Sequence, residues 1–272
     1  MTAIDPPARL GRLNPTGSVP ASGTEHRPDG STRVRGWQLA EEVPVAVLVN
    51  SLSHAVMMAT PADLGDFARG FALTEGLVAS VGDIAQVLVM PVENGIAVDI
   101  ALVPGRSPGR DRGGRAIEGR SGCGICGVSE IEDVVRVEGR VARGIDVSAA
   151  AMLSAGRALA AAQPINALNR SVHAAAWCDR DGRILMVRED VGRHNALDKL
   201  IGALAVAGTD MRTGFVLMSS RCSFELVQKA AIAGVTALVT VSAPTALALG
   251  IAERTGLRLA ALAGDGVIVF NE

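Results

Sequence analysis

Residues 215–254 read FVLMSSRCSFELVQKAAIAGVTALVTVSAPTALALGIAER, and they carry the clearest fold signal in the chain. Residues 215–218 and 235–241 are apolar or β-branched, as expected of buried strands. Each is followed by a helical pattern, over residues 223–233 and 244–254, and Pro at the start of the second suits a first helical turn. Strands that alternate with helices predict an α/β fold with a mostly parallel sheet covered by helices.

The same alternation continues on both sides of this stretch. Upstream we predict helices at 148–163 and 193–206 and strands at 172–178 and 184–187, and downstream short strands at 257–262 and 267–270. Ser148 is a good helix cap, and Pro164 would stop the first helix. Residues 148–272 are therefore assigned to one αβα domain.

A smaller N-terminal domain of strands and helices is predicted over residues 34–103. A Val-rich strand is expected at 42–49, and strands at 87–90 and 96–102 are joined where Asn94-Gly95 favours a hairpin turn. Between them, Thr60-Pro-Ala-Asp63 predicts a helix start with Thr60 as its cap.

Two segments, the N-terminal one and the longest uncharged one, indicate the cellular compartment of the protein. Residues 1–33 hold Pro, Gly and Ser without an apolar segment, which predicts a disordered tail and no secretory signal. The uncharged run 230–252 is long enough to cross a bilayer. Pro244 interrupts it, however, so we expect a buried strand and a packed helix. We predict a cytoplasmic protein with reduced thiols and no membrane contact.

Composition excludes several classes of function. The 272 residues are 49% hydrophobic, so the chain is not disordered as a whole. A formal net charge of −2 argues against a protein that mainly neutralises nucleic-acid phosphates. Aromatic residues make up only 3%, and Tyr is absent, so platforms for base stacking are not expected either.

Residues 104–147 differ from both domains. Residues 104–120 are Gly-rich and hold five arginines against two acidic residues. Such a segment is either a solvated linker or a mobile basic arm that meets an anionic ligand or an acidic partner. It leads directly into the closest pair of cysteines.

That pair lies in Ser121-Gly-Cys-Gly-Ile-Cys-Gly127, and a Cys-x-x-Cys motif has several interpretations. Structural zinc needs four ligands, and no second pair exists here. A nucleobase deaminase would need His-x-Glu and Pro-Cys-x-x-Cys, which are missing. A redox dithiol is usually found at a strand-to-helix turn, not after a Gly-rich loop. The bare glycines and Arg120 favour an exposed thiolate suited to carrying a group, sulfur as a persulfide being one example.

Three polar turns follow successive predicted strands. They are residues 189–194, 219–223 and 242–245. In open α/β sheets, ligands bind at the carboxyl ends of strands, where helix N-termini attract anions. The sequence therefore predicts a crevice for a phosphate-bearing ligand.

Several motifs together resemble those of the FdhD family, sulfurtransferases that act as accessory proteins of formate dehydrogenase. They are Glu42-Val-Pro-Val, Met57-Met-Ala-Thr-Pro-Ala-Asp63, Gly70-Phe-Ala-Leu-Thr-Glu-Gly76, Cys123-Gly-Ile-Cys-Gly127, Glu189-Asp-Val-Gly-Arg-His-Asn-Ala196, Asp198-Lys199, Ser223-Phe-Glu225, Lys229 and Ser242-Ala-Pro-Thr245. The resemblance covers nearly everything except the tail and the basic segment.

The resemblance implies a sulfur carrier. Such proteins take sulfur from a cysteine desulfurase and pass it to the molybdenum (or tungsten) bis-guanylyl-pterin cofactor, bis-MGD, before it enters formate dehydrogenase. The persulfide would form on Cys123, with Cys126 as its partner. The resemblance also implies a cytidine-deaminase-like C-terminal domain without zinc, no structural metal, and a homodimer that binds guanine nucleotide. The alternative is a non-catalytic chaperone that holds the cofactor without moving sulfur.

The resemblance also suggests cofactor contacts. The family's cofactor segment falls on Leu262, Ala263, Gly264, Asp265, Gly266 and Val267, although Asp265 would repel phosphate. Ser219, Arg193, His194, Arg221 and Lys229 are further candidates for phosphate or guanine contacts. Asp190 would hold a guanine edge or cap a helix, and His194 would equally serve as a cap or core residue. Ser220 stands where the family usually has Gly. His173, Cys178 and Cys222 are expected to be buried.

Overall fold

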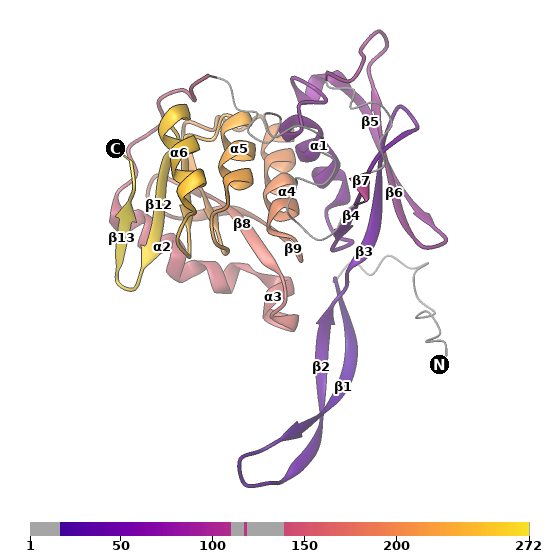
Figure 1. The fold of residues 1–272 in the computed structure, drawn as a ribbon, viewed down its shortest axis with the longest axis vertical. Helices are drawn as coiled ribbons and strands as arrows, with labels where there is room; N and C mark the ends of the chain where they lie inside the picture. The colour runs from indigo at the N-terminus through magenta and orange to yellow at the C-terminus, as the bar shows by residue number, and fades with distance from the viewer. Residues whose placement is uncertain (1–16, 110–116, 119–138, 272) are drawn as a thin grey trace.

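The structure is a computed structural model that describes residues 17–109, 117–118 and 139–271 (Figure 1). These residues form a β-hairpin and two β-sheets that pack against helices. The strands are β1 (Ser18–His26), β2 (Thr32–Ala40), β3 (Val43–Val49), β4 (Leu52–Ala59), β5 (Ile84–Val92), β6 (Gly95–Leu102), β7 (Ile117–Glu118), β8 (His173–Asp179), β9 (Ile184–Asp190), β10 (Gly214–Met218), β11 (Ala237–Thr240), β12 (Arg258–Ala263) and β13 (Gly266–Val269). The helices are α1 (Leu64–Thr74), α2 (Ala149–Leu159), α3 (Pro164–Asn169), α4 (Arg193–Val206), α5 (Phe224–Ile232) and α6 (Ala246–Thr255), with 3-10 turns η1 (Val81–Asp83) and η3 (Ala160–Ala162).

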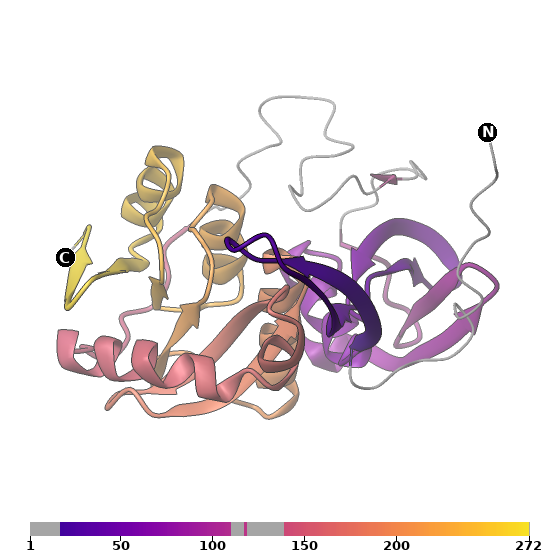
Figure 2. The ribbon, with the colours of Figure 1, turned by 90° about the horizontal axis from the view of Figure 1, so that it is seen from below.

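The larger sheet has six strands in the order β13-β12-β11-β10-β8-β9. Helices α4, α5 and α6 cover one face, and α2 covers the other (Figure 2). Along β10, Val216 and Met218 share a core with α4–α6, whereas Phe215 and Leu217 share a core with α2. This alternation follows from the pleat of a strand. The predicted αβα layering is confirmed.

The prediction that this sheet is mostly parallel is wrong. Among the described strands, the pairs β10–β11 and β11–β12 are parallel, whereas β8–β9, β8–β10 and β12–β13 are antiparallel. The turns from β8 to β9 and from β12 to β13 span only residues 180–183 and 264–265. Connections this short cannot carry the chain across the sheet, so they force hairpins.

The smaller sheet has the order β5-β6-β3-β4-β7 and packs against α1. Its central strand β3 buries Val43, Val45, Val47 and Val49, which contribute to one hydrophobic core together with Phe67 of α1. The strands predicted at 42–49, 87–90 and 96–102 are all present. The chain between residues 43 and 102 thus has a core of its own.

The two halves of the molecule meet where α1 packs against α4 (Figure 1). Glycines allow this contact. A Cβ atom on Gly70 would lie 1.7 Å from the backbone oxygen of Asp198, and one on Gly202 would lie 2.0 Å from that of Asp66. Both distances are far below van der Waals contact, so the helix backbones can approach this closely only because both residues lack a side chain.

The predicted disordered tail is wrong from residue 18 onward. Strands β1 and β2 pair antiparallel from Ser18↔Ala40 to His26↔Thr32 and project from the body (Figure 1). The missed signal is Pro28-Asp29-Gly30, a turn sequence between residues with strand propensity. The Asp29 carboxylate accepts a hydrogen bond from the Ser31 backbone N–H at 2.9 Å, which closes the turn.

Two further expectations have different outcomes. Thr60 does not cap α1, because the helix begins at Leu64 after Asp63, which has a left-handed backbone (φ 54°). The uncharged run 230–252 is a strand, β11, followed by helix α6, as predicted. None of the helices in the described ranges combines the length and apolar character that crossing a bilayer demands.

Candidate functional site

The carboxyl ends of four strands meet at one edge of the larger sheet. Strands β10, β11 and β12 are parallel, and β9 has the same direction because both β9 and β10 are antiparallel to β8. Helices α4, α5 and α6 begin directly after β9, β10 and β11. The three polar turns predicted to gather in one crevice therefore lie along a single edge. We call it the carboxyl edge.

Three helix N-termini at one edge make it electropositive. The caps of α4 and α5, Gly192 and Ser223, accept no side-chain capping bond, whereas Thr245 caps α6 by accepting from the Ala248 N–H at 3.2 Å. The aligned peptide dipoles give each N-terminus a partial positive charge. Arg193, at the start of α4, is half-buried, and Arg221 is exposed in the turn before α5. The edge is therefore suited to an anionic ligand.

A small polar cluster lies just inside this edge. The Nε2 atom of His194 is 3.4 Å from Oγ of Ser223 and 3.7 Å from Oε2 of Glu225. Burial raises the pKa of the Glu225 carboxyl, but the polar groups of His194 and Ser223 beside it outweigh burial and hold the pKa below its ordinary value. Glu225 thus remains a carboxylate beside the imidazole.

Three buried polar atoms of this cluster have unused bonding capacity. Within the described residues, Arg193 Nε, His194 Nδ1 and Glu225 Oε2 have no hydrogen-bond partner. Buried polar groups are normally satisfied by protein, water or ligand. Together they offer donors and an acceptor to a polar group bound at the edge. Sequence reasoning did not select Glu225, although an acidic residue in the first turn of a helix was a usable signal.

His173 and Cys222 lie beside this cluster. Burial, followed by the nearby Arg193 and His194, lowers the pKa of His173, so its imidazole is neutral. Burial raises the pKa of the Cys222 thiol to about 12, and that of Cys178 likewise to about 12. Both thiols have no exposed surface, which confirms the expectation that they are buried. Neither is activated as a nucleophile.

The carboxylate of Asp190 is engaged within the fold. One carboxylate oxygen accepts from Lys199 Nζ at 2.6 Å and from the Thr60 N–H at 3.0 Å. The other accepts from the Gly192 N–H at 2.8 Å and from Asn195 Nδ2 at 3.0 Å. Because the side chain is fully buried, this geometry does not support a guanine contact by Asp190. It joins the two halves of the molecule instead.

The ammonium group of Lys229 also binds inside the protein and not at the carboxyl edge. Its ammonium donates to Asp198 at 2.9 Å, to Thr74 at 2.9 Å and to Glu75 at 3.1 Å. Burial alone would lower the pKa of Lys229, but the carboxylates of Asp198 and Glu75 raise it above its ordinary value. The expected phosphate contact of Lys229 is therefore not supported. The chain has only two lysines, and the structure places both in buried ion pairs within the C-terminal half. Each lysine also donates to the N-terminal half, Lys199 to the Thr60 carbonyl and Lys229 to Thr74 and Glu75.

The remaining predicted contacts do lie at the carboxyl edge. The Ser219 hydroxyl accepts from the Ala174 N–H at 2.8 Å and so ties β10 to β8. Leu262 and Val267 are paired at the end of the β12–β13 hairpin, and residues 263–266 form its exposed tip. The Asp265 side chain is thus free to face solvent at the edge.

Cys123 and Cys126 lie outside the described residues. The chain leaves the described structure at Gly109, whose N–H donates to the Leu77 carbonyl at 2.9 Å, and returns near Val141, whose N–H donates to Thr255 at 2.8 Å. Both anchor points lie near the C-terminal ends of α1 and α6, on the side of the molecule opposite the carboxyl edge. Between them, Glu118 pairs with Val56 of β4.

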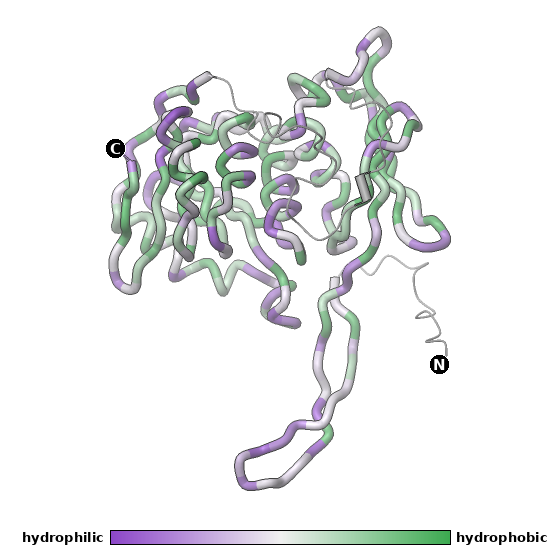
Figure 3. Tube along the Cα trace, in the orientation of Figure 1, coloured by the Kyte–Doolittle hydropathy of each residue, from purple (hydrophilic) through white to green (hydrophobic). Residues whose placement is uncertain are grey.

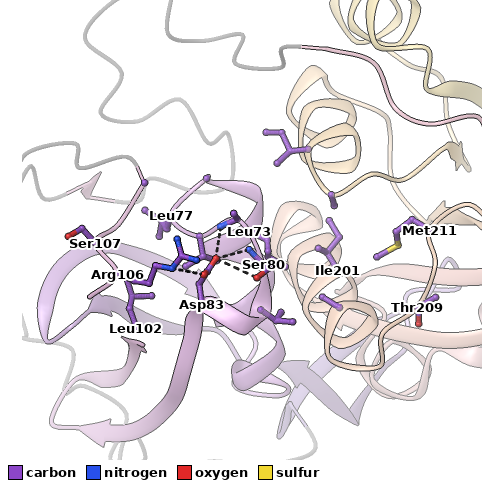
Figure 4. A pocket seen from close by; sticks show the side chains of 18 residues that line it. Leu73, Leu77, Ser80, Asp83, Leu102, Arg106, Ser107, Ile201, Thr209 and Met211 are labelled. Atoms are coloured by element: carbon purple, nitrogen blue, oxygen red, sulfur yellow. Dashed lines mark hydrogen bonds and ion pairs between the residues drawn. The ribbon is translucent and has the colours of Figure 1, made fainter. Parts of the chain in front are cut away.

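A cavity of about 680 Å³ opens between the two halves, next to Gly109 (Figure 4). Its walls are mainly apolar and include Leu73, Leu77 and Ile201. The charged groups at its side are already paired, because Arg106 Nε lies 3.0 Å from the Asp83 carboxylate. The cavity lies beside Gly109, the point at which the chain leaves the described structure before the cysteines. None of the residues that line the cavity has a reactive side chain.

A model of a known protein family matches most of the chain. Residues 40–271 match the model of the FdhD/NarQ family. The chain belongs to the FdhD/NarQ family. The matched region contains both sheets and every helix described above, and it begins at the last residue of β2. Most of the β1–β2 hairpin thus lies outside the part that defines an FdhD/NarQ protein.

Relatives within the FdhD/NarQ family are similar over most of their length. A sulfur carrier protein FdhD from Bordetella petrii is 48% identical over 222 residues, covering 82% of this chain and 80% of its own. One from Xanthomonas euvesicatoria is 46% identical over 249 residues, covering 92% and 88%. The crystal structure of a candidate formate dehydrogenase accessory protein from Desulfotalea psychrophila shares the fold, with a TM-score of 0.71, 23% identity, and coverage of 94% of this chain and 97% of that one.

Proposed function

We propose that this FdhD/NarQ protein is a sulfurtransferase that carries sulfur to the bis-MGD cofactor for formate dehydrogenase. The observation that carries the proposal is the carboxyl edge, where three helix N-termini converge with Arg193 and Arg221. This edge suits the phosphates of a pterin dinucleotide. The names of the relatives, sulfur carrier protein FdhD, support the sulfur chemistry.

In the first step, the Cys123 thiolate attacks the terminal sulfur of a persulfide on a cysteine desulfurase. A new S–S bond forms on Cys123, the S–S bond of the donor breaks, and the donor leaves as a thiolate. Only thiolates are competent for this exchange. The buried thiols of Cys178 and Cys222, with pKa values of about 12, take no part.

In the second step, Cys126 releases the sulfur. Its thiolate attacks the inner sulfur of the Cys123 persulfide, and the terminal sulfur departs as sulfide with the electron pair of the broken bond. The sulfide is delivered to the metal of the cofactor, and a Cys123–Cys126 disulfide remains. A thiol reductant restores the pair. The cofactor is the substrate of this step, and molybdenum or tungsten fits it equally.

The carboxyl edge would hold the cofactor during transfer. Arg221 and Arg193 would face its phosphates, with the helix N-termini behind them. His194 and Glu225 would bind polar groups of the ligand through their unused atoms. Ser219 and the hairpin tip at residues 262–267 would form the sides of the site, with Asp265 turned away from phosphate.

Intact-protein mass spectrometry tests the sulfur chemistry. Wild type, Cys123→Ala and Cys126→Ala are incubated with an active cysteine desulfurase and cysteine. We expect a reductant-sensitive gain of one sulfur in wild type and its loss in Cys123→Ala. If Cys123→Ala still supports formate dehydrogenase activity, the chain is instead a chaperone that holds the cofactor without moving sulfur.

Calorimetric titration with GDP tests the edge separately. Arg221→Ala should weaken binding about tenfold, the effect of losing one charge-assisted contact. Arg254→Ala is the matched control, because Arg254 is exposed in the last turn of α6, away from the helix N-termini. Equal binding by wild type and Arg221→Ala would move the ligand away from this edge.

A further inference from the structure

Thr60 lies at the junction of the two halves, directly after β4, and is completely buried. Its N–H donates to Oδ2 of Asp190 at 3.0 Å, its hydroxyl accepts from the Val191 N–H at 3.1 Å, and its carbonyl accepts from Lys199 Nζ at 3.0 Å. All three partners belong to the C-terminal half. A residue of the N-terminal half thus holds the turn that leads from β9 into α4.

The first turn of α4 has no side-chain cap of its own. Its N-cap residue is Gly192, which lacks the side-chain oxygen that usually binds the first N–H groups of a helix. The Gly192 N–H donates to Oδ1 of Asp190 at 2.8 Å, and the N–H of the preceding residue, Val191, donates to the Thr60 hydroxyl. The geometry of the turn therefore depends on two side chains outside α4, one from each half.

A second contact connects the start of α4 to the end of β4. The Nδ2 atom of Asn195 donates to the Met58 carbonyl at 2.8 Å and to Oδ1 of Asp190 at 3.0 Å. In Figure 3 the end of β4 is hydrophobic, whereas the first turn of α4 is hydrophilic. Because Thr60, Asp190 and Asn195 are all buried, water does not readily replace a hydrogen bond that is lost here.

The turn that Thr60 holds is part of the carboxyl edge. Arg193 and His194 are the first two residues of α4, and within the described residues Nε of Arg193 and Nδ1 of His194 have no hydrogen-bond partner. The N–H groups of the first helical turn also lack partners inside the helix, and they attract an anion to a helix N-terminus. The direction in which these groups face depends on how the turn is oriented.

We propose that Thr60 is a positioning residue for the ligand site at the carboxyl edge. It touches no ligand itself, but it fixes the turn so that Arg193 and the first N–H groups of α4 face the phosphates of the ligand. This inference rests on the proposed nucleotide site, whose other residues all belong to the C-terminal half. It gives the N-terminal half a part in ligand binding. Without the Thr60 hydroxyl, the buried Val191 N–H has no acceptor, and the turn must shift to satisfy it.

Calorimetric titration of the full chain with GDP tests this role. Thr60→Val keeps the size of the side chain and removes the hydroxyl, so GDP binding should weaken about fivefold, the effect of losing one hydrogen bond. Thr60→Ser keeps the hydroxyl and should bind GDP as wild type does. Asn195→Ala removes the other contact with β4 and should weaken binding to a similar extent, so the role is also tested if Thr60→Val does not fold.

Thr74→Val is the matched control. Thr74 is also buried and also joins the halves, but its hydroxyl donates to Asp198 in the second turn of α4, at 2.8 Å. Thr74→Val and Thr60→Val should both lower the urea midpoint, whereas only Thr60→Val should lower the affinity for GDP. A residue that served stability alone would not separate these two measurements.

Hydrogen exchange measured by mass spectrometry follows the turn without a ligand. The backbone amides of residues 189–196 should exchange faster in Thr60→Val than in wild type, and at the wild-type rate in Thr60→Ser and Thr74→Val. Equal GDP affinities of Thr60→Val and wild type, or equal losses of affinity in Thr60→Val and Thr74→Val, would overturn the positioning role alone. A wild type that does not bind GDP would overturn the proposed nucleotide site, and the positioning role with it.

Discussion

The ammonium of Lys199 lies 2.6 Å from the carboxylate of Asp190, and neither side chain has any exposed surface. Lys199 also donates to the backbone carbonyls of Thr60 and Glu189, at 3.0 and 3.1 Å. The Thr60 peptide belongs to the N-terminal half, whereas Asp190 and Lys199 belong to the C-terminal half. A single buried ion pair therefore joins the end of β4 to the strand that enters the carboxyl edge.

Replacing Lys199 should destabilise the whole molecule. In Lys199→Met, a carboxylate is left buried without its cation, which typically costs about 3–5 kcal/mol of unfolding free energy. Urea denaturation followed by circular dichroism measures this change. Arg157→Met is the control, because Arg157 is exposed on α2 and should change stability by about 0.5 kcal/mol or less. A loss below about 1 kcal/mol in Lys199→Met would contradict the burial of this pair.

Amine labelling should distinguish the folded chain from the unfolded one. The only lysines are Lys199, with no exposed surface, and Lys229, 6% exposed. An amine-reactive ester should therefore modify the N-terminal amine alone in the native protein and both lysines as well in denaturant. Intact-mass spectrometry counts the labels. Labelling of Lys199 at equal rates in both conditions would show that the interface between the halves is open.

Local patterns in the sequence predicted most elements well. Helix α4 begins and ends at Arg193 and Val206 as predicted, and it begins directly after the polar turn that follows β9. Ser148 caps α2 by accepting from the Ala151 N–H at 3.2 Å. The carboxyl edge was also predictable, since it follows from which turn succeeds which strand.

The roles of several polar residues were not predictable because their hydrogen-bond partners lie far away in the sequence. Lys229 bonds Thr74, 155 positions away, and Asp190 bonds Thr60, 130 positions away. No local pattern shows such contacts, so the sequence alone did not reveal that the polar groups of both residues are engaged inside the fold. Thr60 was mistaken for a helix cap for the same reason, since its hydroxyl accepts from the Val191 N–H at 3.1 Å instead.

The close contact between helices α1 and α4 can be tested by substituting a glycine. In Gly70→Ala, the new methyl group would meet the Asp198 backbone oxygen at 1.7 Å, so the halves must separate. We expect a loss of about 3 kcal/mol or more, measured by thermal denaturation. Gly250→Ala in α6 has open space around it and should be neutral or stabilising by up to about 1 kcal/mol, because Ala favours helix. Equal effects of the two variants would contradict this crossing.

Stability should depend on pH through His173. Burial lowers its folded-state pKa, so below the ordinary pKa of about 6.5 the unfolded chain binds a proton more readily than the folded one. The stability that depends on a neutral His173 is fully present above about pH 6.5. It is lost as the pH falls toward the lowered pKa of the folded state. His173→Gln should therefore flatten the decline in urea midpoint between about pH 7 and 5. An unchanged pH profile would place the imidazole in solvent.

Thiol reactivity should separate the two pairs of cysteines. Burial raises the pKa of Cys178 and Cys222 to about 12, so almost no thiolate forms on either at neutral pH. A Cys123→Ser/Cys126→Ser variant retains only these two thiols and should react with a disulfide reagent far more slowly than wild type. In denaturant both should react at the rate of free cysteine. Fast reaction in the native variant, or sulfur uptake by it from the desulfurase, would show that a buried thiol is reached and that Cys123 is not the required carrier.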